Sequence, residues 1–158
     1  MAALFFDSSA LIKRYIVETG TEWVIELLRP SIANDVFIAN ITGIEVASAI
    51  ARRLRSGSLD QITAKESLTR FKRDFDKRFI VIDLTEKIIN EGFSLAEKHG
   101  LRGYDTAQLA VGVSVMNRLK QSGIRDFKFI SADNDLNKAA KAEGLTVENP
   151  IDHSLTTN

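Results

Sequence analysis

Five short apolar segments, each bounded by turn-forming or helix-capping residues, recur along the chain. They cover residues 3–6 (ALFF), 36–39 (VFIA), 79–82 (FIVI), 127–130 (FKFI) and, less distinctly, 145–147 (LTV). Segments of this length and apolar content are typical of buried strands. The pattern therefore predicts five strands.

The segments between these strands have helical periodicity. In residues 63–75 (TAKESLTRFKRDF) the apolar side chains recur at intervals of three and four, which places them on one face of a helix. Residues 84–100 repeat this pattern, and Gly100 is well placed to end the helix in a left-handed conformation. The segment 104–123 is apolar nearly all round in its first half, as in a central buried helix. Alternating strands and helices predict an α/β fold with a mainly parallel sheet.

The composition is that of one globular domain spanning residues 1–158, with 44% hydrophobic and 27% charged residues and a loose polar tail at the end. The 21 basic and 21 acidic residues cancel, so a nucleic-acid partner would have to be held by local basic patches. The absence of cysteine excludes disulfides, thiolate zinc sites and a cysteine nucleophile. The sequence contains neither a membrane-span pattern nor a signal-peptide pattern, so we expect a cytoplasmic protein.

Acidic residues are placed where the predicted strands end. Asp7 directly follows the first strand, and Glu45 lies in the first turn of the helix after the second. Asp133 and Asp135 follow the fourth strand, and Asp105 opens the central apolar helix. Because ligands of parallel α/β sheets bind beyond the carboxyl ends of the strands, we expect these five carboxylates at one crevice.

Each of these acids also has a purely structural interpretation. Asp7 and Asp135 are good N-caps, Asp105 gains from the helix macrodipole, and Thr42 with Glu45 forms a capping-box pattern. Several carboxylates aimed into one crevice repel one another, however, and this cost is offset only by a cation between them. We therefore favour a metal site over a set of independent caps.

Oxygen-only ligands select a hard cation, Mg²⁺ or Mn²⁺, which can activate a water and bind a phosphodiester. Ser9 and Ser131 lie close to Asp7 and Asp133 in the sequence and are expected to hydrogen-bond a ligand carboxylate; simple turn or cap hydroxyls are the alternative. Basic residues near these segments are candidates for weak contacts to an RNA backbone, with plain solvated surface as the alternative. They are Lys13, Arg14, Arg52, Arg53 and Arg102.

Four segments, in order, resemble the PIN-domain family, in particular the VapC ribonuclease toxins of type II toxin–antitoxin systems. They are DSSALIKRY, IEVASAIARR, LRGYDTAQLA and SADNDLNKAAKAEGLTV, and they span essentially the whole chain. The resemblance implies a three-layer α/β/α sandwich whose parallel sheet has about five strands in the order 3-2-1-4-5. It also implies Mg²⁺- or Mn²⁺-dependent endonucleolytic cleavage of RNA with water as the nucleophile.

By position, the resemblance implies that four acids are catalytic and bind the metal and that two hydroxyls line the site; one further acid, an extra neighbour, is added as a supporting residue. The four are Asp7, Glu45, Asp105 and Asp133; the supporting residues are Ser9, Ser131 and Asp135. Toxins of this family usually form homodimers and are held inactive by a cognate antitoxin, so both partners are expected here.

Other functions remain open at this point. Phosphoryl transfer through an aspartyl phosphate also uses an Asp at the end of a first strand, but the haloacid dehalogenase pattern requires a second Asp where this chain has Ser9. A non-catalytic PIN-fold binding module would have no use for the mutual repulsion of the acids. A housekeeping RNA-processing enzyme of the same fold is not separated from a toxin by sequence.

Overall fold

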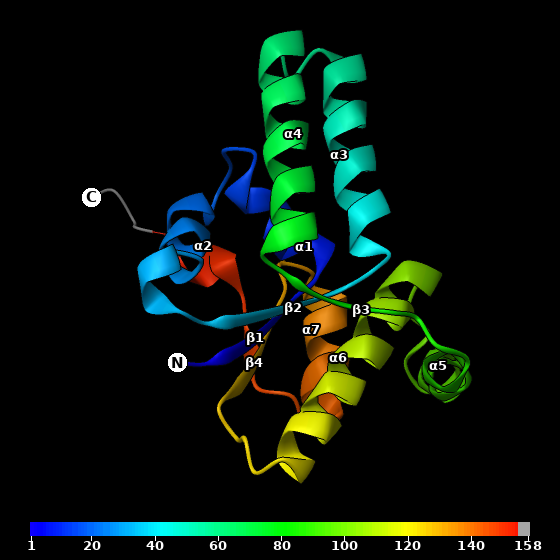
Figure 1. Ribbon diagram of the computed structural model, residues 1–158. Helices are drawn as coiled ribbons and strands as arrows, with labels where there is room; N and C mark the ends of the chain where they lie inside the picture. The colour runs from blue at the N-terminus through cyan, green and yellow to red at the C-terminus, as the bar shows by residue number, and fades with distance from the viewer. Residues whose placement is uncertain (155–158) are drawn as a thin grey trace.

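The computed structural model describes residues 1–154, and part of the expected polar tail, residues 155–158, lies outside the described residues. The chain folds around a five-stranded sheet in which every pair of neighbouring strands is parallel, in the order β3-β2-β1-β4-β5 (Figure 1). The strands are β1 (Ala3–Phe6), β2 (Asp35–Ala39), β3 (Ile80–Ile82), β4 (Phe127–Ile130) and β5 (Val147–Glu148). The predicted α/β class and strand order are confirmed.

The first four strands lie within one residue of their predicted bounds, whereas the fifth is displaced. Residues 145–147 were expected to form it, yet the strand is Val147–Glu148. Gly144 adopts a positive φ of 83° at the turn before it, and Leu145 is then buried in the core. The apolar character of Leu145 reflects helix–sheet packing ahead of the strand, which the sequence pattern does not distinguish from a strand.

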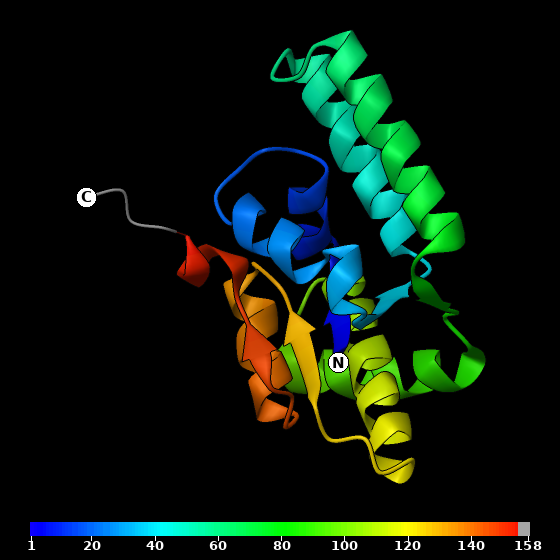
Figure 2. The same ribbon diagram turned by 60° about the vertical axis from the view of Figure 1, so that its left-hand side comes forward.

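One face of the sheet is covered by the first half of the chain (Figures 1 and 2). Leu4 and Phe6 point to this side and share a core with apolar residues of the covering helices. The long pair α3 and α4 projects beyond the sheet (Figure 1). The elements are α1 (Ser8–Leu11), the 3-10 helix η1 (Ile12–Arg14), α2 (Thr21–Leu27), the 3-10 helix η2 (Pro30–Ile32), α3 (Thr42–Ser56) and α4 (Gln61–Lys77).

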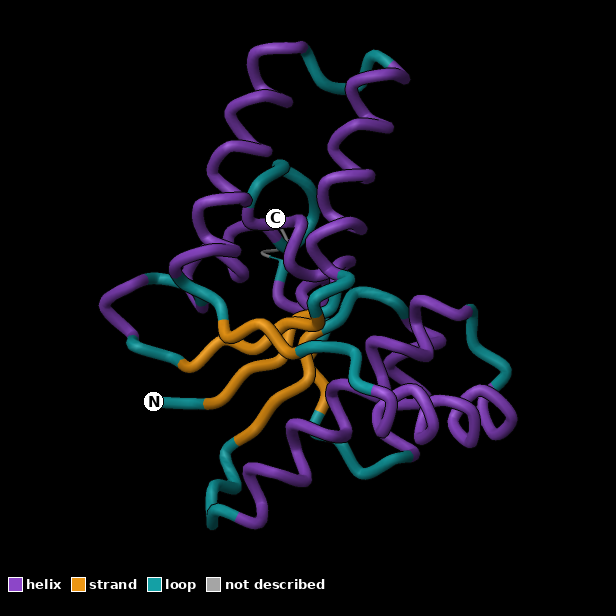
Figure 3. Tube along the Cα trace, turned by 45° about the vertical axis from the view of Figure 1, so that its right-hand side comes forward, coloured by secondary structure: helices purple, strands orange, loops and turns teal. Residues whose placement is uncertain are grey.

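The opposite face is covered by helices from the second half, which complete the three layers (Figure 3). Phe5 points to this side and stacks on Phe129, with ring centroids 5.2 Å apart. A Cβ at Gly112 would lie 2.6 Å from the Phe129 ring, so α6 crosses the sheet closely because that residue has no side chain. The elements are α5 (Glu86–His99), α6 (Gly103–Gln121) and α7 (Asn134–Ala142). The 3-10 helix η3 (Pro150–His153) lies instead against α2 on the first face, where His153 stacks on Trp23.

Gly100 ends α5 in the left-handed conformation that was predicted, with φ of 61°. Among the described helices, none is both long and apolar enough to span a membrane. Because all five strands run in one direction, their carboxyl ends lie at a single edge of the sheet. The helices α1, α3 and α7 begin at this edge, directly after β1, β2 and β4. The fold therefore brings the chain segments that carry Asp7, Glu45, Asp133 and Asp135 to one edge of the sheet.

Candidate active site

Asp7 lies at the centre of this edge, immediately after β1, and is 2% exposed. Its Oδ1 accepts hydrogen bonds from Ser9 Oγ at 2.8 Å and from the Ala10 N–H at 3.0 Å. Asp7 is therefore the N-cap of α1, so the structural interpretation of this residue is correct. Burial nevertheless raises the pKa of Asp7 to about 7 against the opposing hydrogen bonds, and the charge of Glu45 raises the pKa further.

Two serines hold the Asp7 carboxylate and join the ends of the two central strands. Ser131 Oγ donates to Asp7 Oδ2 at 3.1 Å and accepts from the Asp133 N–H at the same distance. Ser9 Oγ, which donates to Asp7, accepts from the Ala132 N–H at 3.0 Å. Both hydroxyls thus bind a carboxylate, as expected, and fix it relative to the loop after β4.

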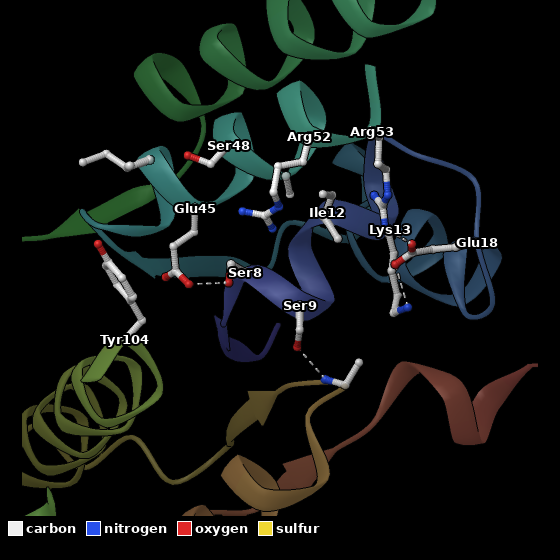
Figure 4. A pocket seen from close by; sticks show the side chains of 13 residues that line it. Ser8, Ser9, Ile12, Lys13, Glu18, Glu45, Ser48, Arg52, Arg53 and Tyr104 are labelled. Atoms are coloured by element: carbon white, nitrogen blue, oxygen red, sulfur yellow. Dashed lines mark hydrogen bonds and ion pairs between the residues drawn. The ribbon is translucent and has the colours of Figure 1, made fainter. Parts of the chain in front are cut away.

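Glu45 reaches the same edge from the first turn of α3. Its carboxylate accepts hydrogen bonds from Ser8 Oγ at 3.0 Å and from Gln108 Nε2 at 2.7 Å (Figure 4 shows the Ser8 contact). Glu45 is therefore held by α1 and α6, and the capping-box alternative with Thr42 is wrong. Thr42 Oγ1 instead accepts a second hydrogen bond from Gln108, at 2.8 Å.

Gln108 was not identified from the sequence, although a signal was present. It lies three residues after Asp105 on α6, and residues three apart share one face of a helix. Gln108 is only 1% exposed, on a helix whose first half is otherwise apolar nearly all round. A buried amide requires hydrogen-bond partners on the neighbouring elements. Glu45 and Thr42 are those partners.

Asp105 and Asp133 stand on neighbouring helices beside these groups. Partial burial raises the pKa of Asp105 above its usual value, and the charges of Asp133, Glu45 and Asp135 raise it further. Asp133 is the N-cap of α7, accepting from the Leu136 N–H at 2.8 Å. The alternative interpretation of Asp135 as the N-cap is wrong, because Asp135 lies inside the first turn of this helix and is exposed.

Two cavities are bordered by some of these acids. The first cavity, of about 580 Å³, is bordered by Ser8, Ser9 and Glu45 (Figure 4), and the second, of about 640 Å³, by Asp105, Asp133 and Asp135. Residues adjacent in the sequence border different cavities. Tyr104 and Ala132 border the first cavity, whereas the next residues, Asp105 and Asp133, border the second. Glu45 thus borders one hollow and Asp105 and Asp133 the other, while the buried Asp7 borders neither.

Some of the predicted RNA-binding basic residues form ion pairs with acidic side chains of this chain, and others do not. Arg14 is engaged, because its Nε donates to the buried Asp74 on α4 at 3.0 Å, so it is not free to contact an RNA backbone. Lys13 pairs with Glu18 at 2.9 Å but still borders the first cavity. Arg52 in the first cavity and Arg102 in the second form no ion pair within residues 1–154.

The residues fit a hard cation by their chemistry. Every candidate ligand is a carboxylate, and the pKa values of Asp7 and Asp105 are raised partly by neighbouring negative charge. In the described part of the chain, no three acidic or histidine side chains are arranged closely enough to form a complete metal site. The acids therefore lie at one edge of the sheet without converging on a single point.

Several solved structures resemble this chain over nearly its whole length. FitAB bound to an IR36 DNA fragment matches 98% of this chain and 99% of its own, with 15% identity and a TM-score of 0.62. VapBC2 from Rickettsia felis, bound to a promoter DNA fragment, matches 93% and 98%, with 15% identity and a TM-score of 0.59. VapC20 from Mycobacterium tuberculosis, a sarcin-ricin loop cleaving toxin, matches 86% and 94%, with 15% identity and a TM-score of 0.58.

The chain has a VapC-like PIN fold. No family model and no curated sequence matches it. The four sequence segments thus correctly indicated the PIN fold, although overall identity to these structures is low. A shared fold does not by itself establish activity, so the function of this chain depends on its own side chains at the candidate site.

Proposed function

We propose that this PIN domain is an Mg²⁺- or Mn²⁺-dependent endoribonuclease. The observation that carries the proposal is the burial of Asp7 at the end of β1, beside the charge of Glu45. A carboxylate needed only as a helix cap would gain nothing from neighbouring negative charge, because Ser, Thr or Asn caps equally well. A site that holds a cation explains both the burial and the clustering.

The proposed ligands are Asp7, Glu45, Asp105 and Asp133. Bound there, the cation would supply Lewis-acid activation of a water and neutralise charge on the phosphodiester. Ser9 and Ser131 orient Asp7 through the hydrogen bonds described above, while Ser8 and Gln108 orient Glu45. The exposed Asp135 adds negative charge beside Asp105.

We further propose that the protein is a homodimeric, cytoplasmic toxin paired with a cognate antitoxin. The similarity to FitAB, VapBC2 and the sarcin-ricin loop cleaving toxin VapC20 supports this proposal. Growth arrest on induction without a partner protein is expected of a toxin, and its absence would favour a housekeeping RNA-processing enzyme.

Cleavage of labelled single-stranded RNA by the purified chain tests the ribonuclease proposal, with Asp105→Asn as the paired variant. Asp105 is partly exposed in the first turn of α6, so the variant is expected to fold. We expect cutting by the parent with Mg²⁺ or Mn²⁺, none with EDTA, and none by the variant. Equal cutting by parent and variant, or cutting that persists in EDTA, would overturn the proposal.

A further inference from the structure

The first cavity has three chemically distinct parts (Figure 4). Tyr104 and Ile44 form an apolar end, and their side chains are 62% and 67% exposed. Glu45, Ser8 and the guanidinium of Arg52 lie in the middle of the view, while Lys13 and Arg53 lie on the far side from Tyr104 (Figure 4). One hollow therefore joins an apolar face, part of the acid cluster and a set of cations.

The basic end carries more positive than negative charge. Lys13 and Arg53 share one carboxylate, Glu18, at 2.9 and 2.6 Å, and Arg52 adds a third cation without a hydrogen-bond or ion-pair partner in residues 1–154. Nη1 of Arg53 is buried and lacks a partner among the described residues. Arg52 is exposed, so an incoming anion can contact it without displacing a protein partner.

The apolar end is an aromatic surface directly beside the acids. Tyr104 precedes Asp105 in the chain, and its ring borders the cavity instead of packing into either core. Aromatic rings exposed next to a nucleic-acid site stack with unpaired bases, which is how proteins commonly engage single-stranded RNA. Ile44 widens this surface from the first turn of α3.

We propose that the first cavity binds two consecutive nucleotides of a single-stranded RNA. The base of one stacks on Tyr104, the phosphate between them lies at the acids, and the next phosphate contacts Arg52 and Arg53. The inference rests on the proposed ribonuclease function and assigns its substrate-positioning residues. A duplex cannot be bound in this way, because its bases are stacked on one another and not available to Tyr104.

Binding can be measured without cutting in an Asp105→Asn background, using fluorescence anisotropy of a labelled single-stranded oligoribonucleotide and of its duplex. Added Tyr104→Ala is expected to weaken single-strand binding by about 10-fold or more, whereas Tyr104→Phe keeps the affinity, because the ring remains. Arg52→Gln should weaken binding and lower the slope of log affinity against log salt by about 0.7.

Arg118→Gln is the matched control, because Arg118 is an exposed arginine in the last turn of α6, about 20 Å along the helix from its first turn. We expect no change in affinity from it. Tyr104 and Arg52 are exposed, so their variants should melt as the background protein does.

The subsite is overturned if Tyr104→Ala and Arg52→Gln bind the single strand as the background does, or if the duplex binds equally well. In the first case, an exposed surface for a protein partner would be the better explanation of Tyr104. An Asp105→Asn protein that binds no oligoribonucleotide also overturns the subsite. Cleavage by the parent chain then decides the ribonuclease proposal separately.

Discussion

Nε2 of Gln108 lies 2.7 Å from Oε1 of Glu45, so a buried amide on α6 fixes the position of a carboxylate on α3. The same nitrogen donates to Thr42 Oγ1 at 2.8 Å. Because the two helices approach from different faces of the sheet, this contact connects the two layers at the candidate site. The position of Glu45 thus depends on a residue that bears no charge.

Replacing this amide should impair catalysis more than folding. Gln108→Leu keeps the approximate size of the buried side chain but leaves Glu45 without its α6 donor. We expect RNA cleavage to fall by about 10- to 100-fold, in line with the loss of groups that orient metal ligands. Gln121→Leu, at the exposed far end of the same helix, should cleave like the parent. Unchanged cleavage by a folded Gln108→Leu protein would show that Glu45 needs no such support.

The pKa of Asp7 predicts how stability depends on pH in metal-free protein. Its pKa is about 7 in the folded chain against 3.8 ordinarily, so the folded state binds the proton more tightly than the unfolded state. The free energy of unfolding should therefore fall as pH rises from about 4 to about 7, by at most about 4 kcal/mol from this group. Asp7→Asn lacks this contribution.

Chemical denaturation of parent and Asp7→Asn in EDTA, at about pH 5 and about pH 8, isolates the effect. We expect the variant to gain stability relative to the parent at the higher pH. Asp105, whose pKa is also raised, is present in both proteins and largely cancels. A difference between the two proteins that stays constant across this range would contradict the burial of an ionisable Asp7.

Gly112 and Gly92 offer a matched pair of glycine-to-alanine changes within helices. At Gly112 a Cβ would lie 2.6 Å from the Phe129 ring, whereas at Gly92 a Cβ would lie 3.9 Å from Cβ of Ala110. Thermal denaturation should show that Gly112→Ala destabilises by about 1–3 kcal/mol through overpacking. Gly92→Ala should stabilise by up to about 1 kcal/mol through helix propensity. Equal effects would mean that α6 can move away from the sheet freely.

Arg14 and Asp74 form a largely buried pair that we expect to serve stability and not RNA binding. Asp74 Oδ2 also accepts a hydrogen bond from the Tyr15 hydroxyl at 2.9 Å. Asp74→Asn should lower the free energy of unfolding by about 3 kcal/mol, because it leaves the Arg14 charge without its counter-ion. The salt dependence of RNA binding by the folded variant should match the parent. A changed slope of log affinity against log salt would instead indicate that Arg14 contacts the RNA backbone.

Several features that depend on residues close in the sequence were predicted correctly. The apolar segments located β1 to β4, and the acids after them were placed at the correct edge because parallel strands end together. Asp7 and its serines were identified because a hydroxyl two residues from a carboxylate, or on the adjacent strand end, falls within hydrogen-bond reach.

Partnerships between distant segments were not predictable from one sequence. Gln108 meets Glu45 across 63 residues, and Arg14 meets Asp74 across 60, so neither contact leaves a local pattern. The choice between Asp133 and Asp135 as the cap of α7 depends on where the chain leaves β4, because Ser131 already holds the Asp133 N–H there. The place of Tyr104 beside the acids became evident only from the lining of the first cavity.

Titration calorimetry with Mn²⁺ tests the central claim most directly, because it reports on the carboxylates without requiring the correct RNA. The parent should bind Mn²⁺ and release protons near pH 7, since Asp7 is partly protonated before the ion binds. Asp7→Asn and Asp105→Asn should lose most of this binding while remaining folded. Absence of binding to the parent at millimolar Mn²⁺, or equal binding by both variants, would contradict the account.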